Sequence, residues 1–267
     1  MAMSANAEAR QGAVDAVLTD LRTVPAGLSD ELFAIADALG ESAQLRRAVT
    51  EPAMPVADRQ AVARQLFAGK VSEVAVSILV AGIGQNWRSA LALVGAIDRQ
   101  GVRAALLAAE QAGRLDQVEA TLFRFGRIAD GDHQLRTTLG DRNASLEGRV
   151  EIVRTLLKGK VPDETIALAQ RAVVARDHTF DQTLESYLQI SATLRRRSLA
   201  TVVVAHPLTT DQEARLEAAL TAQAGRPVNL MVVVDPSLVG GVRVEIGDEI
   251  IDGSMAGRFE AARRQLA

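Results

Sequence analysis

Four titratable residues near the C-terminus have the types and spacing for acid–base chemistry or cation binding. Asp248, Glu249 and Asp252 place three carboxylates within five positions, and His206 ends an apolar run in the same part of the chain. Paired carboxylates can act as general acid and base, and clustered carboxylates can bind cations. However, turn aspartates commonly bond their own backbone, and Asp252 before Gly253-Ser254 fits a turn that begins a helix. The sequence therefore favours structural roles for the carboxylates, and a surface or structural role for His206.

Two Gly-Lys pairs and a run of arginines are the other groups that could bind phosphate. Gly69-Lys70 and Gly159-Lys160 are each followed by valine and lack the glycine spacing of a phosphate loop. Both are predicted to be helix stops with a cation near the carbonyl end. Arg195-Arg196-Arg197 could bind phosphate or an acidic partner, but cations at the end of a helix also offset the helix dipole. We therefore expect no catalytic, cofactor-binding or metal-binding residues.

The composition narrows the classes of protein to which the chain can belong. With 267 residues, 48% of them hydrophobic, it can build one large domain or two ordinary ones. It has no cysteine, so disulfides and thiolate metal sites are excluded. A net charge of −3 and only 3% aromatic residues argue against nucleic acid as the principal partner. No apolar run is long enough to cross a bilayer and no secretion signal is recognisable, so we expect the chain to remain in the cytoplasm.

A small sheet is needed to position the carboxylates and glycines near the C-terminus. Residues 199–205 and 228–234 are β-branched or alternate in polarity, which predicts strands. Thr210 and Glu213 have the spacing of a capping box. The predicted order is strand, helix, strand, hairpin and last helix, over residues 199–205, 210–224, 228–234, 242–246 with 249–252, and 255–266. The residues assigned to the structural motif of this part are Gly240, Gly241, Gly247, Asp252, Gly253 and Ser254.

The rest of the chain has the three-and-four apolar spacing of amphipathic helices. The predicted helices cover residues 7–21, 28–39, 42–49, 57–67, 72–83 and 87–112. A shift of 90 residues aligns the chain with itself without gaps at eleven identical positions. These pairs are Leu32 with Leu122, Phe33 with Phe123, Gln44-Leu45-Arg46 with Gln134-Leu135-Arg136, Arg59 with Arg149, Arg64 with Arg154, Leu66 with Leu156, and Gly69-Lys70-Val71 with Gly159-Lys160-Val161.

The repeat and the change of periodicity near residue 199 together predict the fold class. We expect a mainly α N-terminal part, made of two tandem helical bundles, and a small C-terminal α+β domain with a β-hairpin. The expected divisions are a first bundle over residues 1–97, a second over 98–197 and the α+β domain over 198–267.

Five short motifs in the C-terminal part carry a resemblance to a known family. They are Asp235-Pro236-Ser237-Leu238, Gly240-Gly241-Val242, Ile246-Gly247-Asp248, Ile251-Asp252-Gly253-Ser254 and Gly257-Arg258. This pattern resembles the signature of the delta subunit of F-type ATP synthases, called in mitochondria the oligomycin-sensitivity-conferring protein. Residues 104–122 also look like the first helix and turn of that family. The extra copy over residues 1–97 departs from the usual length, and a lengthened form of this kind resembles the actinobacterial members.

The resemblance implies a non-catalytic subunit of the peripheral stalk, which joins the catalytic head to the stalk and holds it against torque. The implied partners are the N-terminal segments of the alpha subunits, received by a helical bundle, and the b-type stalk helices, met by the C-terminal part. The implied location is the cytoplasmic face of the cell membrane, which the chain meets only through the complex. The residues leave two alternatives open: a free-standing helical adaptor, or a small enzyme that uses Asp248 with His206.

Overall fold

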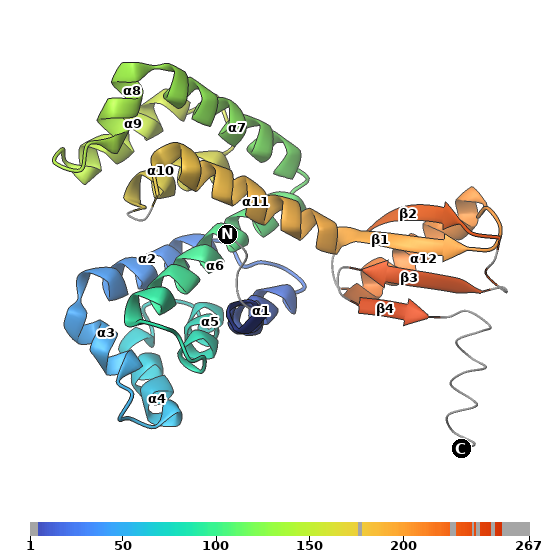
Figure 1. Ribbon diagram of the computed structural model, residues 1–267, viewed down its shortest axis with the longest axis horizontal. Coiled ribbons are helices and arrows are strands. Elements are labelled where there is room, and N and C mark those ends of the chain that lie inside the picture. The colour runs from blue at the N-terminus through green and yellow to red at the C-terminus, as the bar shows by residue number, and fades with distance from the viewer. Residues whose placement is uncertain are drawn as a thin grey trace. The chain divides into compact units, whose positions relative to one another are not determined.

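The computed structural model describes residues 5–175, 178–224, 228–236, 238, 241–246 and 249–252. They form two compact units, residues 1–188, called here the helical unit, and residues 189–267, called the sheet unit (Figure 1). Among the described residues, no helix combines the length and the apolar character needed to cross a membrane.

The helical unit consists of helices, of which the first six match the predicted ranges closely and the later ones lie in the predicted second bundle. They are α1 (Ala5–Thr19), α2 (Leu28–Glu41), α3 (Ala43–Thr50), α4 (Val56–Phe67), α5 (Glu73–Ile83), α6 (Ala90–Gln111), α7 (Leu115–Gly131), α8 (His133–Gly140), α9 (Leu146–Leu157), α10 (Asp163–Val174) and α11 (Phe180–Ser198), the last of which extends beyond the boundary of the unit. The prediction of a mainly helical N-terminal part is therefore confirmed.

The internal repeat is visible in the helix boundaries. The helices α3, α4, α5 and α6 begin 90 residues before α8, α9, α10 and α11. The caps repeat as well, since Ser42 and Asp132 each accept a hydrogen bond from the backbone N–H three residues later, at 3.1 and 3.0 Å. Arg46 and Arg136 each donate to a carbonyl at the end of the preceding helix, at 2.9 Å to Gly40 and 2.6 Å to Asp130. The two copies therefore share local hydrogen bonds as well as residues.

The helix α6 belongs to both copies. Shifted by 90 residues, α1 falls on residues 95–109, which lie inside α6, so this helix ends the first copy and begins the second. Residues 100–107 are all buried, which requires neighbours on every side of the helix, and α2 and α5 contact it as well as α7 and α10. We call α1 to α6 the first copy and α6 to α11 the second copy. The predicted boundary at 97/98 falls inside α6, and the division into three parts stays a prediction.

The sheet unit contains a four-stranded sheet in the order β2-β1-β3-β4. Its elements are β1 (Leu199–Val204), α12 (Thr210–Ala224), β2 (Asn229–Val234), β3 (Val242–Ile246) and β4 (Glu249–Asp252). β1 pairs in parallel with β2 and antiparallel with β3, and β3 pairs antiparallel with β4. The predicted hairpin is thereby confirmed, with Ile246 opposite Glu249. The last helix, predicted over 255–266, lies outside the described residues.

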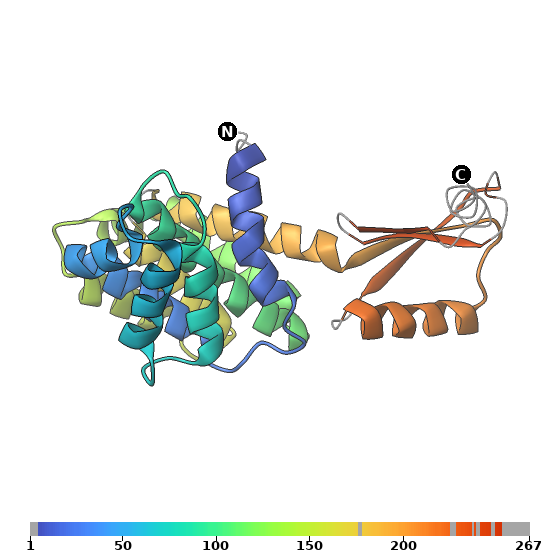
Figure 2. The ribbon, with the colours of Figure 1, turned by 90° about the horizontal axis from the view of Figure 1, so that it is seen from below.

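One face of the sheet packs against α12 (Figure 2). Its core contains Ala200, Val202, Val204, Leu220, Val228 and Val244. The predicted cap of α12 is wrong by one residue: Thr209, not Thr210, accepts from the N–H of Gln212 at 3.3 Å, and the Gln212 side chain accepts from the N–H of Thr209 at 2.9 Å. Both registers of this sequence have capping-box spacing, and the earlier one is used.

Candidate interaction sites

The described residues contain no group of three or more His, Cys, Asp or Glu side chains that could hold a metal ion. His206 is exposed after β1, and His133 stands at the start of α8 beside Arg136, 3.4 Å from its guanidinium. Asp248, the residue that an enzymatic role would pair with His206, lies outside the described residues.

Two of the six residues assigned to the C-terminal motif are described. Gly241 has a φ of +86°, a left-handed conformation that favours glycine, immediately before β3. Asp252 is the last residue of β4 and pairs with Arg243 of β3 through the backbone register. The other four, Gly240, Gly247, Gly253 and Ser254, lie outside the described residues, so their assignment stays a prediction.

The two Gly-Lys pairs terminate helices. Gly69 and Gly159 have φ values of +68° and +72°, directly after the ends of α4 and α9. The Lys160 ammonium donates to the carbonyl of Leu156 at 3.0 Å, as expected of a cation at a helix C-terminus. The prediction of helix stops is confirmed.

An ion network centred on Arg171 joins the two copies. Arg171 of α10 donates to both carboxylate oxygens of Asp37 in α2, at 2.7 and 2.9 Å, and also to Asp98 in α6. Its guanidinium carbon lies 4.7 Å from the centroid of the Phe33 ring. Burial raises the pKa of the Asp98 carboxyl, while the neighbouring Arg171 guanidinium lowers it. Because Arg171 is nearly buried, the network fixes α2 against the second copy.

A second buried network attaches the N-terminal helix. The Asp15 carboxylate in α1 accepts from Arg99 and from Gln100 at 2.7 Å each, and also pairs with Arg103. Asp15 is 4% exposed and Arg103 is 1% exposed, so the pair is withdrawn from water. All three partners lie on α6, which makes Asp15 the polar anchor of α1.

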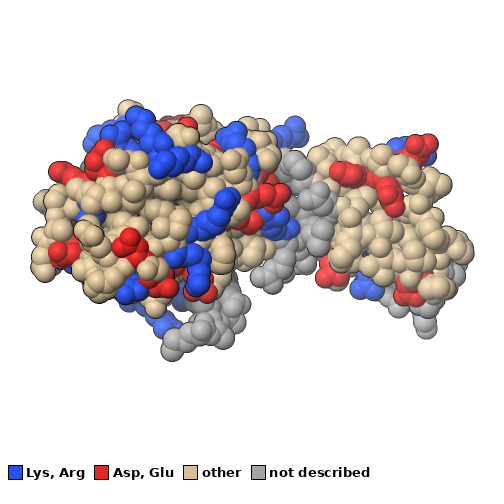
Figure 3. Space-filling model, turned by 90° about the horizontal axis from the view of Figure 1, so that it is seen from above, with Lys and Arg blue, Asp and Glu red and all other residues tan. Residues whose placement is uncertain are grey.

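The second face of the sheet has apolar side chains without an α-helix described over it. Met231 and Val233 of β2 are 46% and 42% exposed, and the register places them beside Thr201 and Val203 of β1. Figure 3 shows mostly uncharged side chains and several acidic ones on the visible side of the sheet unit, and both basic and acidic side chains across the visible side of the helical unit.

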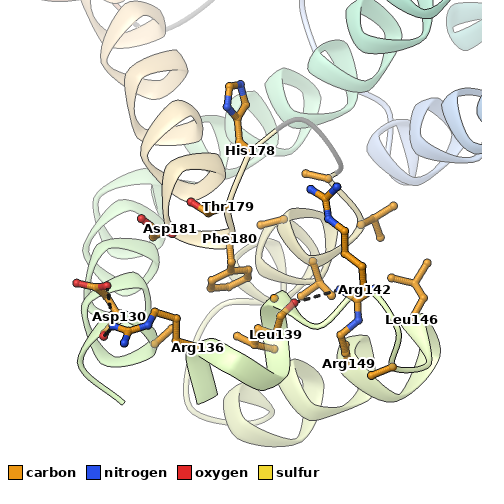
Figure 4. A pocket seen from close by; sticks show the side chains of 17 residues that line it. Asp130, Arg136, Leu139, Arg142, Leu146, Arg149, His178, Thr179, Phe180 and Asp181 are labelled. Atoms are coloured by element: carbon orange, nitrogen blue, oxygen red, sulfur yellow. Dashed lines mark hydrogen bonds and ion pairs between the residues drawn. The ribbon is translucent and has the colours of Figure 1, made fainter. Parts of the chain in front are cut away.

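A cleft of about 610 Å³ opens in the second copy, where α7, α8 and α10 end and where α9 and α11 begin (Figure 4). Its apolar lining includes Leu139, Leu146, Val173 and Phe180, and its cationic lining includes Arg136, Arg142 and Arg149. The Phe180 ring packs edge-on against Phe125, with centroids 5.7 Å apart. His178 points away from the Phe180 ring. Sequence reasoning did not find this cleft.

Comparison with known proteins identifies the family. The family model described as "ATP synthase delta (OSCP) subunit" matches residues 97–266, which correspond to the second copy and the sheet unit. ATP synthase subunit delta of Cutibacterium acnes is 40% identical over 247 residues, covering 92% of this chain and 94% of the relative. The subunit delta of Streptomyces coelicolor is 40% identical over 252 residues, covering 94% and 92%. Both relatives therefore span the first copy as well.

A structural comparison adds a distant match, to a chain of the Toxoplasma gondii mitochondrial ATP synthase hexamer. It has a TM-score of 0.31 and 19% identity, and covers 62% of this chain and 94% of that chain, a similarity too low to support an argument.

The helical part followed by a small α+β unit, together with the family model and the two relatives, indicates a structural subunit of the ATP synthase complex. The chain belongs to the ATP synthase delta (OSCP) subunit family. It is a peripheral-stalk subunit of the ATP synthase, a membrane-associated complex.

Proposed function

We propose that the chain is a non-catalytic adaptor that joins the alpha subunits of the catalytic head to the b-type stalk helices, on the cytoplasmic face of the membrane. The observation that carries this proposal is the family match, which runs without interruption from the second copy through the sheet unit. An adaptor needs two docking regions on one chain, and the two compact units supply them.

The helical unit is the proposed receiver of the N-terminal segments of the alpha subunits. An amphipathic helix binds a protein by laying its apolar face into a groove between helices. The helical unit offers exposed apolar side chains for such contacts, among them Leu91 at 60%, Phe123 at 59% and Ile128 at 60% exposure.

The sheet unit is the proposed receiver of the b-type stalk helices. The second sheet face combines Met231, Val233 and the half-buried Val203, and an amphipathic helix could bury these side chains. The neighbouring positions on β3, Arg243 and Glu245, are exposed and charged, and could pair with the polar flanks of such a helix.

The mechanical requirement on an adaptor is that load applied at one end reaches the other with little internal movement. Close packing gives protein interiors low compressibility, and the continuous burial of α6 places such packing between the copies. The Arg171 network adds directional contacts between α2, α6 and α10. These features support a rigid helical unit under torque.

Co-purification from membranes tests the proposal. A tagged chain should retain both the head and the b-type subunit, whereas Met231→Lys should retain the head and lose the b-type subunit, because a lysine would prevent burial of the sheet face. Ala218→Lys, at an exposed position of α12, is the control that adds the same charge, and it should behave as the unmodified chain. Retention of the b-type subunit by Met231→Lys would refute the assignment of this face. Failure of the unmodified chain to retain either partner would favour a free-standing adaptor.

A further inference from the structure

The two edges of the sheet differ in length and in charge. β2 and β4 are the outer strands of the four-stranded sheet. β4 has four residues, of which Glu249 and Asp252 are acidic, whereas β2 has six residues and contains neither a charged residue nor a proline. Proteins commonly blunt exposed edges with charges, prolines or short strands, because the unpaired N–H and C=O groups of an edge can pair with another strand. β4 has two of these features and β2 has none.

The unpaired backbone groups of β2 belong to alternate residues. The N–H of Asp235, just after the strand, donates to the carbonyl of Val204 in β1 at 2.9 Å. Successive residues of a strand direct their backbone groups to opposite sides, so Leu230, Val232 and Val234 direct theirs away from β1. In the part of the chain that the structure describes, no strand pairs with this side of β2. Each of the three residues therefore offers one N–H donor and one C=O acceptor at the edge.

The side chains of β2 are apolar on both faces of the sheet. Leu230 and Val232 pack against the core beneath α12, whereas Met231 and Val233 are exposed on the second face. Val234, at the end of the strand, is exposed as well. A polar side chain placed beside these residues would lose water without gaining a hydrogen bond. A strand that pairs with this edge should therefore be apolar on both faces, and β2 itself meets that requirement.

We propose that β2 pairs antiparallel with β2 of another molecule of this chain, which joins the two sheets edge to edge. With Val232 opposite the same residue of the other molecule, Leu230 lies opposite Val234. Met231 then lies opposite Val233 on the second face of the joined sheet. Every facing pair is apolar, and the residues whose backbone groups point outward face each other, so each such pair exchanges two N–H···O bonds.

Charge and symmetry favour this pairing over the alternatives. Two β4 edges would bring Glu249 and Asp252 of both molecules together, and like charges on neighbouring strands are unfavourable. β2 has no charged residue with which to select a different sequence, whereas its own sequence fits on both faces. A twofold contact of this kind is closed, so the assembly ends at two molecules. The inference concerns the chain outside the ATP synthase and does not depend on the proposed function.

Sedimentation equilibrium of the purified full chain tests the pairing. A contact of one strand from each molecule is small, so we expect a dissociation constant on the order of 100 µM. The weight-average mass should rise from that of one chain towards that of two between about 5 and 500 µM, and no further.

Amide hydrogen exchange, resolved to single residues by NMR, locates the contact. At about 500 µM the N–H groups of Leu230, Val232 and Val234 should exchange at least about threefold more slowly than in the dilute chain. The N–H groups of Met231 and Val233 point towards β1 and should change little.

Val232→Pro is the decisive variant, because it removes an outward N–H and no donor to β1. Proline is tolerated on an edge strand where the missing N–H would face outward. Self-association should weaken by about tenfold or more, whereas the matched control Val232→Ala keeps the N–H and should remain within about threefold of the unmodified chain. Circular dichroism checks that both variants fold.

Val234→Lys tests the edge separately and serves if the proline variant does not fold. A charge at this exposed position, opposite the apolar Leu230, should weaken self-association by at least about fivefold. Ala218→Lys, at an exposed position of α12, adds the same charge away from the edge and should remain within about twofold of the unmodified chain.

A chain that stays monomeric up to about 500 µM would overturn the proposal. It would also be overturned by self-association without slower exchange at the three outward N–H groups, because the contact would then lie elsewhere. Undiminished association of Val232→Pro or Val234→Lys, or equal weakening by Val232→Pro and Val232→Ala, would exclude backbone pairing at this edge. These measurements use the chain alone, so none of their outcomes bears on co-purification with the head and the stalk.

Discussion

The two helical copies place identical residues in different environments. Phe33 is 8% exposed, packed against Gly101 and covered by Arg171, whereas its equivalent, Phe123, is 59% exposed. The helix boundaries and caps repeat at the same spacing, so the difference arises from what surrounds each helix. The comparison teaches that duplication preserved the scaffold while the contacts on its surface became specialised.

Two glutamines show that the copies can join the same pair of helices by a hydrogen bond donated from either helix. Gln60 of α4 donates to the carbonyl of Val80 in α5 at 2.9 Å, and Gln170 of α10 donates to that of Val150 in α9 at 3.4 Å. Positions 60 and 80 are equivalent to 150 and 170, so the same helix pair is bridged from opposite sides in the two copies. Both copies therefore have a side-chain hydrogen bond between these two helices, and either helix can supply the donor.

The largest expected effect comes from Asp15, whose equivalent in the second copy is the apolar Ala105. Asp15→Asn should lower the free energy of unfolding by about 3 kcal/mol, because Arg103 would remain buried without a carboxylate. Urea denaturation measures the change. Asp20→Asn, an exposed position just after α1, should cost less than about 0.5 kcal/mol. Equal effects of the two substitutions would show that charge does not anchor α1.

Arg171→Met should cost about 2–4 kcal/mol at neutral pH, because Asp98 would lose the cation that partly offsets its burial. A carboxyl whose folded-state pKa is raised destabilises the fold as pH rises through that pKa. Removing Arg171 should raise the pKa of Asp98 further. The destabilisation caused by Arg171→Met should therefore become smaller as the pH is lowered towards the acid range, where Asp98 is protonated. Adding Asp98→Asn should recover part of the stability at neutral pH. The ion pair would not stabilise the fold in this way if Arg171→Met lowered the free energy of unfolding equally at every pH and Asp98→Asn restored none of it.

Gly101→Ala should lower the free energy of unfolding by about 1–3 kcal/mol, because the new Cβ would lie 2.5 Å from the Phe33 ring. Gly95→Ala is the matched control in the same helix, since a Cβ there meets nothing within 4 Å. It should stabilise the chain by up to about 1 kcal/mol through helix propensity. Thermal and urea unfolding measure the stability of both variants. If both substitutions changed the free energy of unfolding in the same direction, close packing of α2 on α6 would be contradicted.

The smallest expected effects concern the helix stops that the copies share. Gly69→Ala and Gly159→Ala should each cost about 1 kcal/mol, because both glycines have positive φ. Side-by-side urea unfolding compares the two costs. Costs that agree within error would support equivalent backbones in the two copies, whereas a loss confined to one glycine would show that the repeat has diverged in conformation there.

Local structure could be predicted from the sequence because it depends on neighbours in the chain. The helix stops at Gly69 and Gly159 and the hairpin over 242–252 follow from residue order alone. The cap of α12 was misplaced by one residue because two overlapping registers have the same spacing. The Arg171 network joins residues up to 134 positions apart, and no local pattern marks it. The cleft was missed because its lining comes from several helices that are separated in the sequence.

The central claim is that this chain transmits load between the head and the membrane sector. ATP-driven proton pumping by membranes depleted of the chain, measured as the purified chain is added back, tests it most directly. We predict that pumping is lost on depletion and restored by the unmodified chain, but not by Met231→Lys, while the head hydrolyses ATP throughout. Pumping that persists without the chain, or that Met231→Lys restores fully, would contradict the account.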